Sequence, residues 1–286
     1  MSFRTIVIKE RSKLDLKMNY LVCRNTKEIK VFIPEISVLI LESTAISLTT
    51  ALVSELVKNN VKIIFCDEKH NPESEVCSCY SSYNSSKKIA NQIAWNQATK
   101  NKIWQRIIQN KIKQQRTFLA ELHCYSEANT LGNYEKNVKE NDETNREGHS
   151  AKVYFNALFG LDFFRRNQNA TNSALNYGYA IILSCFNREI AKSGYLTQLG
   201  IWHKNEYNPY NLASDLMEPF RILVDRLVYK MGNNINDYKV NLLDLFNIQL
   251  KINSKMQFLE NAISIYCQSI FNALDNNNED LICFYE

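Results

Sequence analysis

The pattern of apolar and polar positions is strand-like near the beginning of the chain. Up to residue 72, apolar and β-branched residues come in short runs that turn-forming residues separate. Such runs predict β-strands, because a strand buries its side chains over only a few residues. Strands are predicted at 5–8, 20–23, 30–33, 37–41 and 61–65. Segment 49–59 has helical spacing instead, so residues 1–72 predict a small β-sheet domain with one helix.

The rest of the chain has a helical pattern. Residues 73–86 are rich in Ser, Tyr and Asn without any period, which indicates a linker or flap. A long amphipathic helix is predicted from residue 87, with Trp104 on its apolar stripe and Trp95 off it. A polar connection, with room for a short helix, is predicted at 126–145. Further helices are predicted at 146–159, 172–193, 212–231, 238–250 and 254–274. The predicted fold class is α+β: an N-terminal β-sheet domain (1–72), then a larger all-α C-terminal domain (87–286).

Segment 211–225 combines an apolar stripe with two acidic residues. Asp215 and Glu218 lie about 60° apart on a helical wheel, away from that stripe. Pro219 has no N–H to donate, so we expect a kink or a new turn beside it. Two acids one turn apart repel each other, so we expect a positive group to face them. Taken alone, the segment favours a solvated acidic flank, with a metal ion as the alternative.

Two further residues are candidates for chemistry. Thr144 and Glu147 have the spacing of a capping box, in which the glutamate would serve only the helix terminus. Glu147 also precedes an apolar stripe that includes Tyr154, where a buried carboxylate would need a cation. The segment supports both interpretations equally. His203 follows Trp202, and a lone histidine beside tryptophan is more often a packed or surface residue than a ligand.

The composition adds a marked charge asymmetry. The formal net charge is +4, from 34 basic and 30 acidic residues. Residues 81–120 hold eight of the basic residues and no acid, so the remainder has 26 basic residues against all 30 acidic ones. A basic segment on a mildly acidic protein favours contact with a polyanion such as nucleic acid over an ordinary surface helix. Lys100, Arg106 and Lys111 belong to this segment.

Several classes of protein and site are disfavoured. The seven glycines form no G-x-G-x-x-G or Walker loop, which argues against a nucleotide-binding fold. Apolar runs are too short for a membrane helix and the first residues show no secretion signal, so we expect a cytoplasmic protein without membrane contact. The eight cysteines are scattered, and Cys77 and Cys79 have neither zinc spacing nor a second pair, which argues against zinc.

Three motifs, in this order and spacing, resemble those of the CRISPR-associated integrases of the Cas1 family, the catalytic subunits of spacer acquisition. They are Asn145-Arg-Glu-Gly-His-Ser-Ala151, Gly200-Ile-Trp-His203 and Asp215-Leu-Met-Glu-Pro-Phe-Arg221. The segments at 3–8, 12–14 and 176–179 are similar to those of type II systems. The similarity extends over nearly the whole chain.

The resemblance implies a site and an activity. It assigns Glu147, His203 and Glu218 as metal ligands and catalytic residues, with Asp215 as a supporting catalytic acid. Two carboxylates and one imidazole suit Mg²⁺ or Mn²⁺, either of which can polarise a phosphodiester. The implied reaction is transesterification: the 3′-hydroxyl of a short captured DNA attacks a phosphodiester at the edge of a CRISPR repeat. His203 could also shuttle a proton.

The resemblance also implies partners. We expect a homodimer, with the N-terminal domain serving dimerisation and docking, and two such dimers around a dimer of the companion subunit Cas2 in a heterohexamer. Other type II CRISPR proteins are further candidates, and the substrate is double-stranded DNA. The expected DNA-binding residues, from the resemblance, the motifs and the basic segment, are Arg146, Tyr177, Lys204, Arg221, Lys100, Arg106 and Lys111.

Two alternative functions remain open at this point. One is a stand-alone metal-dependent DNA nuclease with the same site. The other is a non-catalytic DNA-binding scaffold whose acidic residues are structural.

Overall fold

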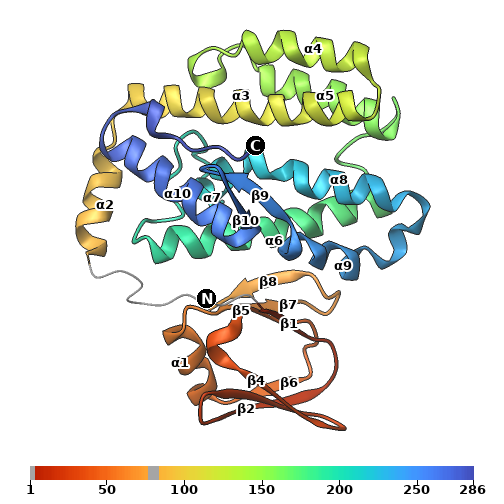
Figure 1. Ribbon diagram of the computed structural model, residues 1–286, viewed down its shortest axis with the longest axis vertical. Coiled ribbons are helices and arrows are strands. Elements are labelled where there is room, and N and C mark those ends of the chain that lie inside the picture. Colours follow the sequence, from red (N-terminus) through yellow and green to blue (C-terminus); the bar gives the residue numbers. More distant parts are fainter. Residues whose placement is uncertain (1–3, 77–83) are drawn as a thin grey trace. The chain divides into compact units, whose positions relative to one another are not determined.

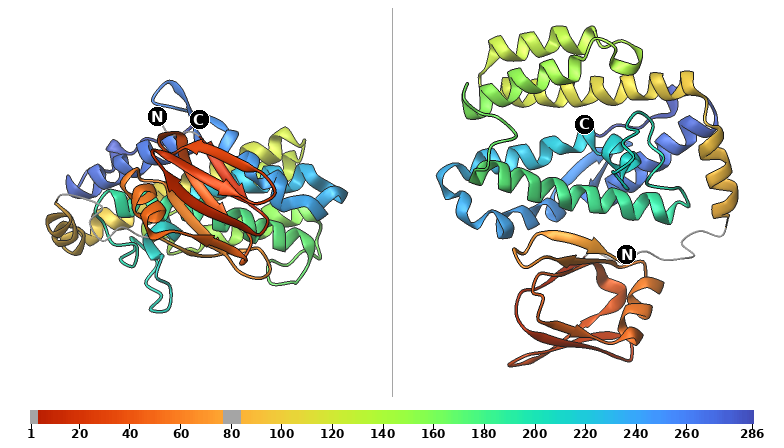
Figure 2. Two further views of the ribbon diagram at one scale, coloured as in Figure 1. Left: turned by 90° about the horizontal axis from the view of Figure 1, so that it is seen from below. Right: turned by 180° about the vertical axis from the view of Figure 1, so that it is seen from behind.

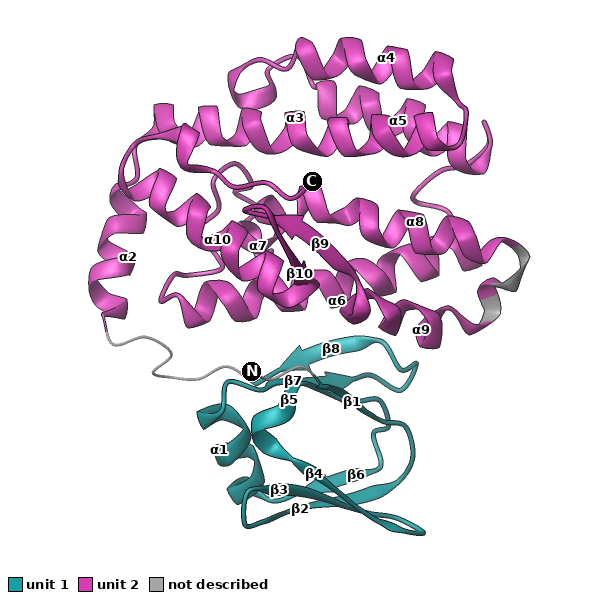
Figure 3. Ribbon diagram, viewed as in Figure 1, with its two compact units in different colours: residues 1–80 teal, residues 81–286 magenta. Residues whose placement is uncertain are grey.

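The computed structural model describes residues 4–76 and 84–286. The chain divides into two compact units, residues 1–80 and 81–286 (Figure 3). Cys77 and Cys79 lie outside the described residues, and the cysteines within them are free thiols.

The first unit contains two four-stranded sheets. One has the order β1-β5-β7-β8, with bounds Arg4–Ile8, Ile36–Leu41, Lys62–Cys66 and Pro72–Glu75. Its first three strands are parallel and β8 is antiparallel to β7. Because β8 continues the sheet beyond residue 72, the first unit extends further than the domain that the sequence pattern indicated, and residues 73–75 are strand and not linker.

The second sheet has the order β4-β3-β2-β6, with bounds Glu28–Phe32, Tyr20–Arg24, Ser12–Lys17 and Ile46–Leu48. Helix α1 (Thr50–Lys58) begins where the Thr49 side chain accepts a hydrogen bond from the Leu52 N–H. Its buried Leu52 and Leu56 join apolar side chains from both sheets, among them Leu14 and Leu39, in one core. The helix predicted at 49–59 is therefore present. The five predicted strands correspond to β1, β3, β4, β5 and β7, whereas β2 and β6 were not predicted.

The second unit is mainly helical and carries the candidate chemistry. Its helices are α2 (Ser85–Ala94), α3 (Gln97–Glu121), α4 (Tyr125–Lys136), α5 (Arg146–Phe159), α6 (Ala170–Lys192), α7 (Asn211–Leu216), α8 (Arg221–Met231), α9 (Tyr238–Asn241) and α10 (Leu259–Asp275). Helices α3, α4 and α5 lie side by side, and α6, α8 and α10 form a second layer (Figures 1 and 2). One apolar core joins the two layers, with Trp104, Phe186, Phe220 and Tyr266 among its fully buried side chains.

Three helix predictions need correction. The long helix predicted from residue 87 is broken, because Asn96 caps the start of α3 through its side chain. As a result Ile93 is 70% exposed, whereas Trp95 is buried and donates its Nε1–H to Asp275. The helices predicted at 238–250 and 254–274 give way in part to a hairpin of β9 (Gln249–Ile252) and β10 (Lys255–Phe258).

The predicted α+β class is confirmed: a β-sheet unit is followed by a mainly helical one. The second unit is not all-α, since it includes the β9–β10 hairpin. Among the described residues, no helix has both the length and the apolar character that crossing a membrane requires.

Candidate metal centre

Glu147 lies at the start of α5 but does not cap it. Asn145, with φ of 50°, accepts a hydrogen bond from the Gly148 N–H. The Asp142 carboxylate accepts hydrogen bonds from the backbone N–H groups of Arg146 and Glu147, at 2.8 and 3.0 Å. These two side chains satisfy the helix terminus, so of the two interpretations left open for Glu147, the capping box with Thr144 does not form. The Glu147 carboxylate is left for another partner.

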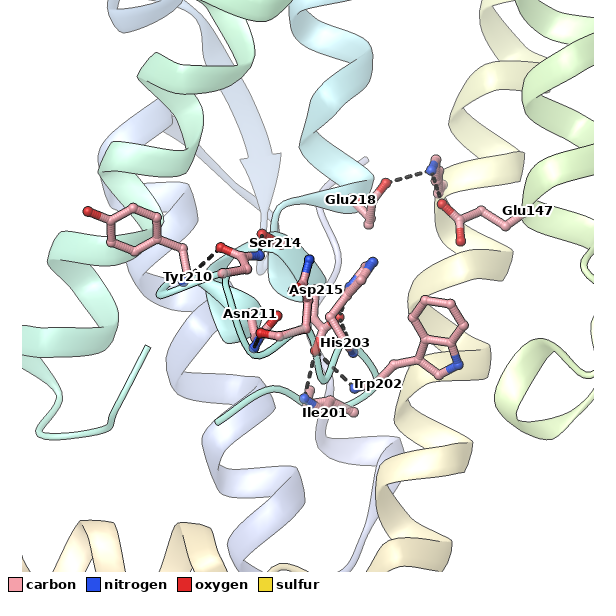
Figure 4. Close-up of polar contacts among 12 residues, drawn as sticks. Glu147, Ile201, Trp202, His203, Tyr210, Asn211, Ser214, Asp215 and Glu218 are labelled. Atoms are coloured by element: carbon pink, nitrogen blue, oxygen red, sulfur yellow. Dashed lines mark hydrogen bonds and ion pairs between the residues drawn. The ribbon is translucent and has the colours of Figure 1, made fainter. Parts of the chain in front are cut away.

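That partner is Lys111, in the middle of α3. Its Nζ lies 2.6 Å from Glu147 Oε1 and 2.5 Å from Glu218 Oε2. The Lys111 side chain is 11% exposed and that of Glu218 is 4% exposed. We call Glu147 and Glu218 the glutamate pair; in Figure 4 they reach toward one another from two different elements. Both carboxylates therefore converge on one cationic point.

Glu218 reaches this point because the predicted helix at 212–231 is interrupted. Helix α7 ends at Leu216, a 3-10 turn covers Glu218–Phe220 with Pro219 inside it, and α8 begins at Arg221. The interruption at Pro219 agrees with the expected effect of a missing N–H. Glu218 and Asp215 are both buried, so the solvated acidic flank that the segment alone favoured is wrong.

The charges around the glutamate pair stabilise one another. Burial alone would raise the pKa of Glu218, but Arg221 and Lys111 outweigh it and the pKa is lowered. Burial would lower the pKa of Lys111, but Glu147 and Glu218 outweigh it and the pKa is raised. Arg221 Nε lies 2.9 Å from Glu218 Oε1. Glu218, Lys111 and Arg221 therefore stabilise one another in their charged forms.

Asp215 holds the segment that carries His203. Its Oδ2 accepts the N–H groups of Ile201 and Trp202 at 2.6 and 2.9 Å, and its Oδ1 accepts the His203 N–H at 3.2 Å. Oδ1 also lies 2.5 Å from His203 Nδ1 (Figure 4). A Cβ atom at Gly200 would stand 2.4 Å from the His203 carbonyl oxygen, so only glycine fits there. Asp215 thus positions His203 and does not face the glutamate pair directly.

Two tryptophans surround the imidazole. The rings of Trp104 and Trp202 stack with centroids 5.0 Å apart and an interplanar angle of 6°. His203 lies edge-on to both rings, at 5.8 and 4.8 Å. Burial would lower the pKa of His203, but the hydrogen bond and charge of Asp215, followed by the charges of Glu218 and Glu147, raise it. The ring is therefore fixed by a carboxylate on Nδ1, the usual arrangement of a metal-ligating histidine.

Arg221 connects the glutamate pair to a second buried carboxylate. Its guanidinium carbon lies 4.8 Å from the ring centroid of Tyr179. The Tyr179 and Tyr154 hydroxyls both donate to Asp225, the latter at 3.1 Å. Burial raises the pKa of Asp225 to about 6 although both hydrogen bonds oppose that rise. This network fixes Arg221, and through it Glu218.

The structure separates the expected DNA-binding residues. Lys100 and Lys204 line a cavity of about 800 Å³ together with His203. Two assignments are corrected. Lys111 is buried between two carboxylates, so it is not a surface contact for DNA. Tyr177 is 4% exposed and packs against Tyr238, so its ring is not available to DNA either.

The other basic residues have varied surroundings. Arg221 contacts Glu218, and Arg146 places its guanidinium 5.4 Å from the Tyr134 ring centroid. Arg106 is exposed and lies 3.8 Å from Asp280 in a loose pair. Acids from outside the acid-free segment also pair with Lys88, Lys102 and Arg116. The positive charge of this segment is therefore partly neutralised by acids that are distant in sequence.

The donor set fits a divalent metal. Two carboxylates already contact one cation, and His203, held through Nδ1, has Nε2 as its second nitrogen. Within residues 4–76 and 84–286, however, no three acidic, histidine or cysteine side chains meet closely enough to form a metal site as they stand. The Lys111 ammonium lies at the point where the two glutamates meet.

Two features of the site were not expected from the sequence. Lys111 was expected on the surface, because a run without acids does not show which distant acids fold against it. Trp104 was expected in the core, and it is fully buried, but its stacking on Trp202 beside His203 depends on tertiary contacts. Its helical spacing was the only local signal.

Comparison with known proteins identifies the family of this chain. Residues 5–260 match the family described as CRISPR associated protein Cas1. A CRISPR-associated endonuclease Cas1 from Neisseria meningitidis serogroup C (strain 8013) is 34% identical over 237 residues, which cover 81% of this chain and 78% of the relative.

Solved structures share the fold at low identity. A casposase bound to integration product is 18% identical with a TM-score of 0.76, covering 98% of this chain and 92% of that one. A chain of a partial Cas6-RT-Cas1–Cas2 complex is 18% identical with a TM-score of 0.67, covering 98% and 97%. With the family match spanning most of its length, this chain belongs to the Cas1 family of CRISPR-associated proteins.

Proposed function

We propose that this protein is a metal-dependent DNA integrase of CRISPR adaptation, which inserts short captured DNA into the repeat array. The observation that carries the proposal is the convergence of Glu147 and Glu218 on one cationic point, with His203 fixed nearby by Asp215. Membership of the Cas1 family supports it, as does a relative named as an endonuclease. A fold neighbour is described as bound to an integration product.

The residues of the site have distinct tasks. Glu147 and Glu218 would supply oxygen ligands to the metal, and His203 would supply Nε2. Asp215 accepts a hydrogen bond from His203 Nδ1 and so fixes the orientation of the ring. Bound Mg²⁺ or Mn²⁺ would polarise the phosphoryl group and stabilise the charge that develops on its oxygens. Lys100 and Lys204, which line the cavity with His203, would position the DNA backbone without selecting a sequence.

The reaction balances without an external energy source. The 3′ oxygen of the captured DNA forms a bond to a phosphorus atom at the repeat edge, and the bond from that phosphorus to the 3′ oxygen of the repeat strand breaks. The proton lost by the attacking hydroxyl is matched by one gained on the leaving oxygen. One phosphodiester replaces another, so ATP is not required.

We place the protein in a homodimer that assembles with a Cas2 dimer. The Cas2 partnership is supported by a fold neighbour that is described as a complex containing both Cas1 and Cas2. Size-exclusion chromatography with light scattering, on the chain alone and with Cas2, tests this assembly. A monomer that does not bind Cas2 would contradict it.

A strand-transfer assay tests the activity. Glu147→Gln and Glu218→Gln keep the side-chain shape but remove a ligand charge, so joining of a labelled DNA to a repeat-bearing plasmid in Mn²⁺ should fall below detection. DNA binding should be unchanged. Glu143→Gln is the matched control, since Glu143 is exposed and close to Glu147 in the chain. If both variants join DNA as the wild type does, the assignment of Glu147 and Glu218 to the metal site is wrong. If the wild type only degrades DNA even with Cas2 present, the protein is a nuclease and not an integrase.

A further inference from the structure

Lys111 occupies the place in this site where a divalent cation would be expected. Its ammonium lies 2.6 Å from one glutamate and 2.5 Å from the other. These two residues come from different elements, the start of α5 and the turn before α8. A single group from α3 therefore holds together the two carboxylates that the proposed function assigns to the metal.

The charges of the cluster cancel. Glu147 and Glu218 contribute two negative charges, and Lys111 and Arg221 contribute two positive charges. A divalent cation that joined this neutral cluster would lie beside two positive groups at short range. Like charges at such distances repel strongly inside a protein. One of the two basic groups has to move away before the cation gains a net attraction.

Lys111 is the basic group that can leave. A lysine ammonium is a compact charge on a flexible stem, whereas an arginine guanidinium is planar and rigid. Arg221 lies against the Tyr179 ring and is held there. The Lys111 ammonium forms an ion pair with Glu218 Oε2 at 2.5 Å, and a metal ion bound by the same oxygen can replace that pair.

We propose that Lys111 is a resident counter-cation: it keeps the glutamate pair together in the absence of metal, and its ammonium withdraws when a divalent cation binds. This inference rests on the proposed function, because it takes the glutamate pair as metal ligands. It gives Lys111 two opposite effects. Lys111 stabilises the metal-free fold, and it weakens metal binding because it competes for the same carboxylates.

Removal of the charge separates these effects. In Lys111→Met the glutamate pair faces no lysine, so Mn²⁺ should bind about tenfold more tightly by isothermal titration calorimetry, as expected when a close competing charge is removed. The melting temperature without metal should fall, and its rise on adding Mn²⁺ should exceed that of the wild type. Lys113→Met is the control, since Lys113 is exposed on the same helix. Unchanged or weaker Mn²⁺ binding by Lys111→Met overturns the proposal.

A second measurement needs no variant. Acetylation of the wild-type protein, followed by mass spectrometry, reports how accessible each lysine is. Lys111 should react slowly without metal, because it is buried between two carboxylates, and several times faster at saturating Mn²⁺. Lys113 should react equally in both conditions. Equal protection of Lys111 with and without bound Mn²⁺ overturns the proposal.

The two hypotheses fail in different ways. If the wild type binds Mn²⁺ and Glu218→Gln abolishes that binding, the proposed metal site stands whatever Lys111 does. If Lys111 then shows neither competition nor exposure, only the counter-cation role is wrong. If the wild type does not bind Mn²⁺ at all, both are wrong.

Discussion

Replacement of Asp215 by asparagine removes one charge from a side chain that accepts four hydrogen bonds. Oδ2 accepts two backbone N–H groups and Oδ1 accepts a third together with the His203 ring. Each oxygen of Asp215 accepts hydrogen bonds from two donors. In either orientation of an asparagine, its NH₂ group would therefore face two donors and lose both hydrogen bonds. Asp215 is fully buried, and hydrogen bonds to a charged group contribute about 1.5–3 kcal/mol each. Losing two of them should cost roughly 3–6 kcal/mol of unfolding free energy.

Urea unfolding followed by tryptophan fluorescence measures this cost. The three tryptophans, Trp95, Trp104 and Trp202, all belong to the second unit, so the signal reports that unit alone. Asp162→Asn removes the same charge from an exposed position and serves as the control. If Asp215→Asn unfolds at the same urea concentration as Asp162→Asn, the hydrogen bonds to Asp215 do not hold the fold as described.

The same variant should change the titration of His203. Asp215 raises the pKa of His203, so the pair contributes stability that is fully present below the ordinary histidine pKa and is lost as pH rises through the raised one. In Asp215→Asn the pKa of His203 should fall, and this pH-dependent stability should disappear. NMR titration of the imidazole measures the change, and an unchanged His203 pKa would refute the argument.

Three further predictions concern the surroundings of the site. Gly200→Ala should lower the unfolding free energy by about 2 kcal/mol, because the new Cβ meets the backbone of His203; an unchanged urea midpoint would show that the segment can move aside. The raised pKa of Asp225 gives the wild type stability that is lost as pH rises toward 6. The difference in unfolding free energy between wild type and Asp225→Asn should therefore shrink by roughly 2 kcal/mol between pH 4 and 7. A difference that stays constant over this range would contradict the prediction. Replacing Lys100 and Lys204 by glutamine should reduce the slope of log affinity for DNA against log salt by about 0.9 per lost phosphate contact, and an equal slope would exclude them as contacts.

Local patterns predicted the elements that local contacts decide. The helix predicted at 146–159 is α5 with the same bounds, because its apolar spacing follows the helical period. The capping box, one of two interpretations that the sequence left open, does not form, since Asn145 is the capping residue and adopts a left-handed conformation. The sequence placed Glu147 correctly on the helix, but it could not decide what the carboxylate contacts.

The β9–β10 hairpin was missed although the sequence contains its signal. Leu250 and Ile252 are buried and alternate with the exposed Lys251, which is a strand period. Asn253 and Ser254 have φ of 49° and 62°, so they form a two-residue loop with positive φ, as a tight hairpin requires. The many apolar residues around this short alternation favoured a helix over it.

The partners of Lys111 could not be predicted from sequence. Nearby basic residues indicated a surface that binds anions, although Ile107 and Ile108 precede Lys111 at helical spacing and place it on the apolar flank. Its actual partners lie far away in sequence, with Glu147 separated from it by 36 positions. Burial of a lysine depends on such distant acids, which a pattern within one helix does not contain.

The position of the bound metal tests the account most directly. Crystals of the full chain grown with Mn²⁺ would show the ion by its anomalous scattering. We expect one peak in contact with Glu147, His203 and Glu218, with the Lys111 ammonium displaced from between the glutamates. A peak elsewhere, or a fully occupied Lys111 contact with both glutamates beside a bound ion, would contradict the account.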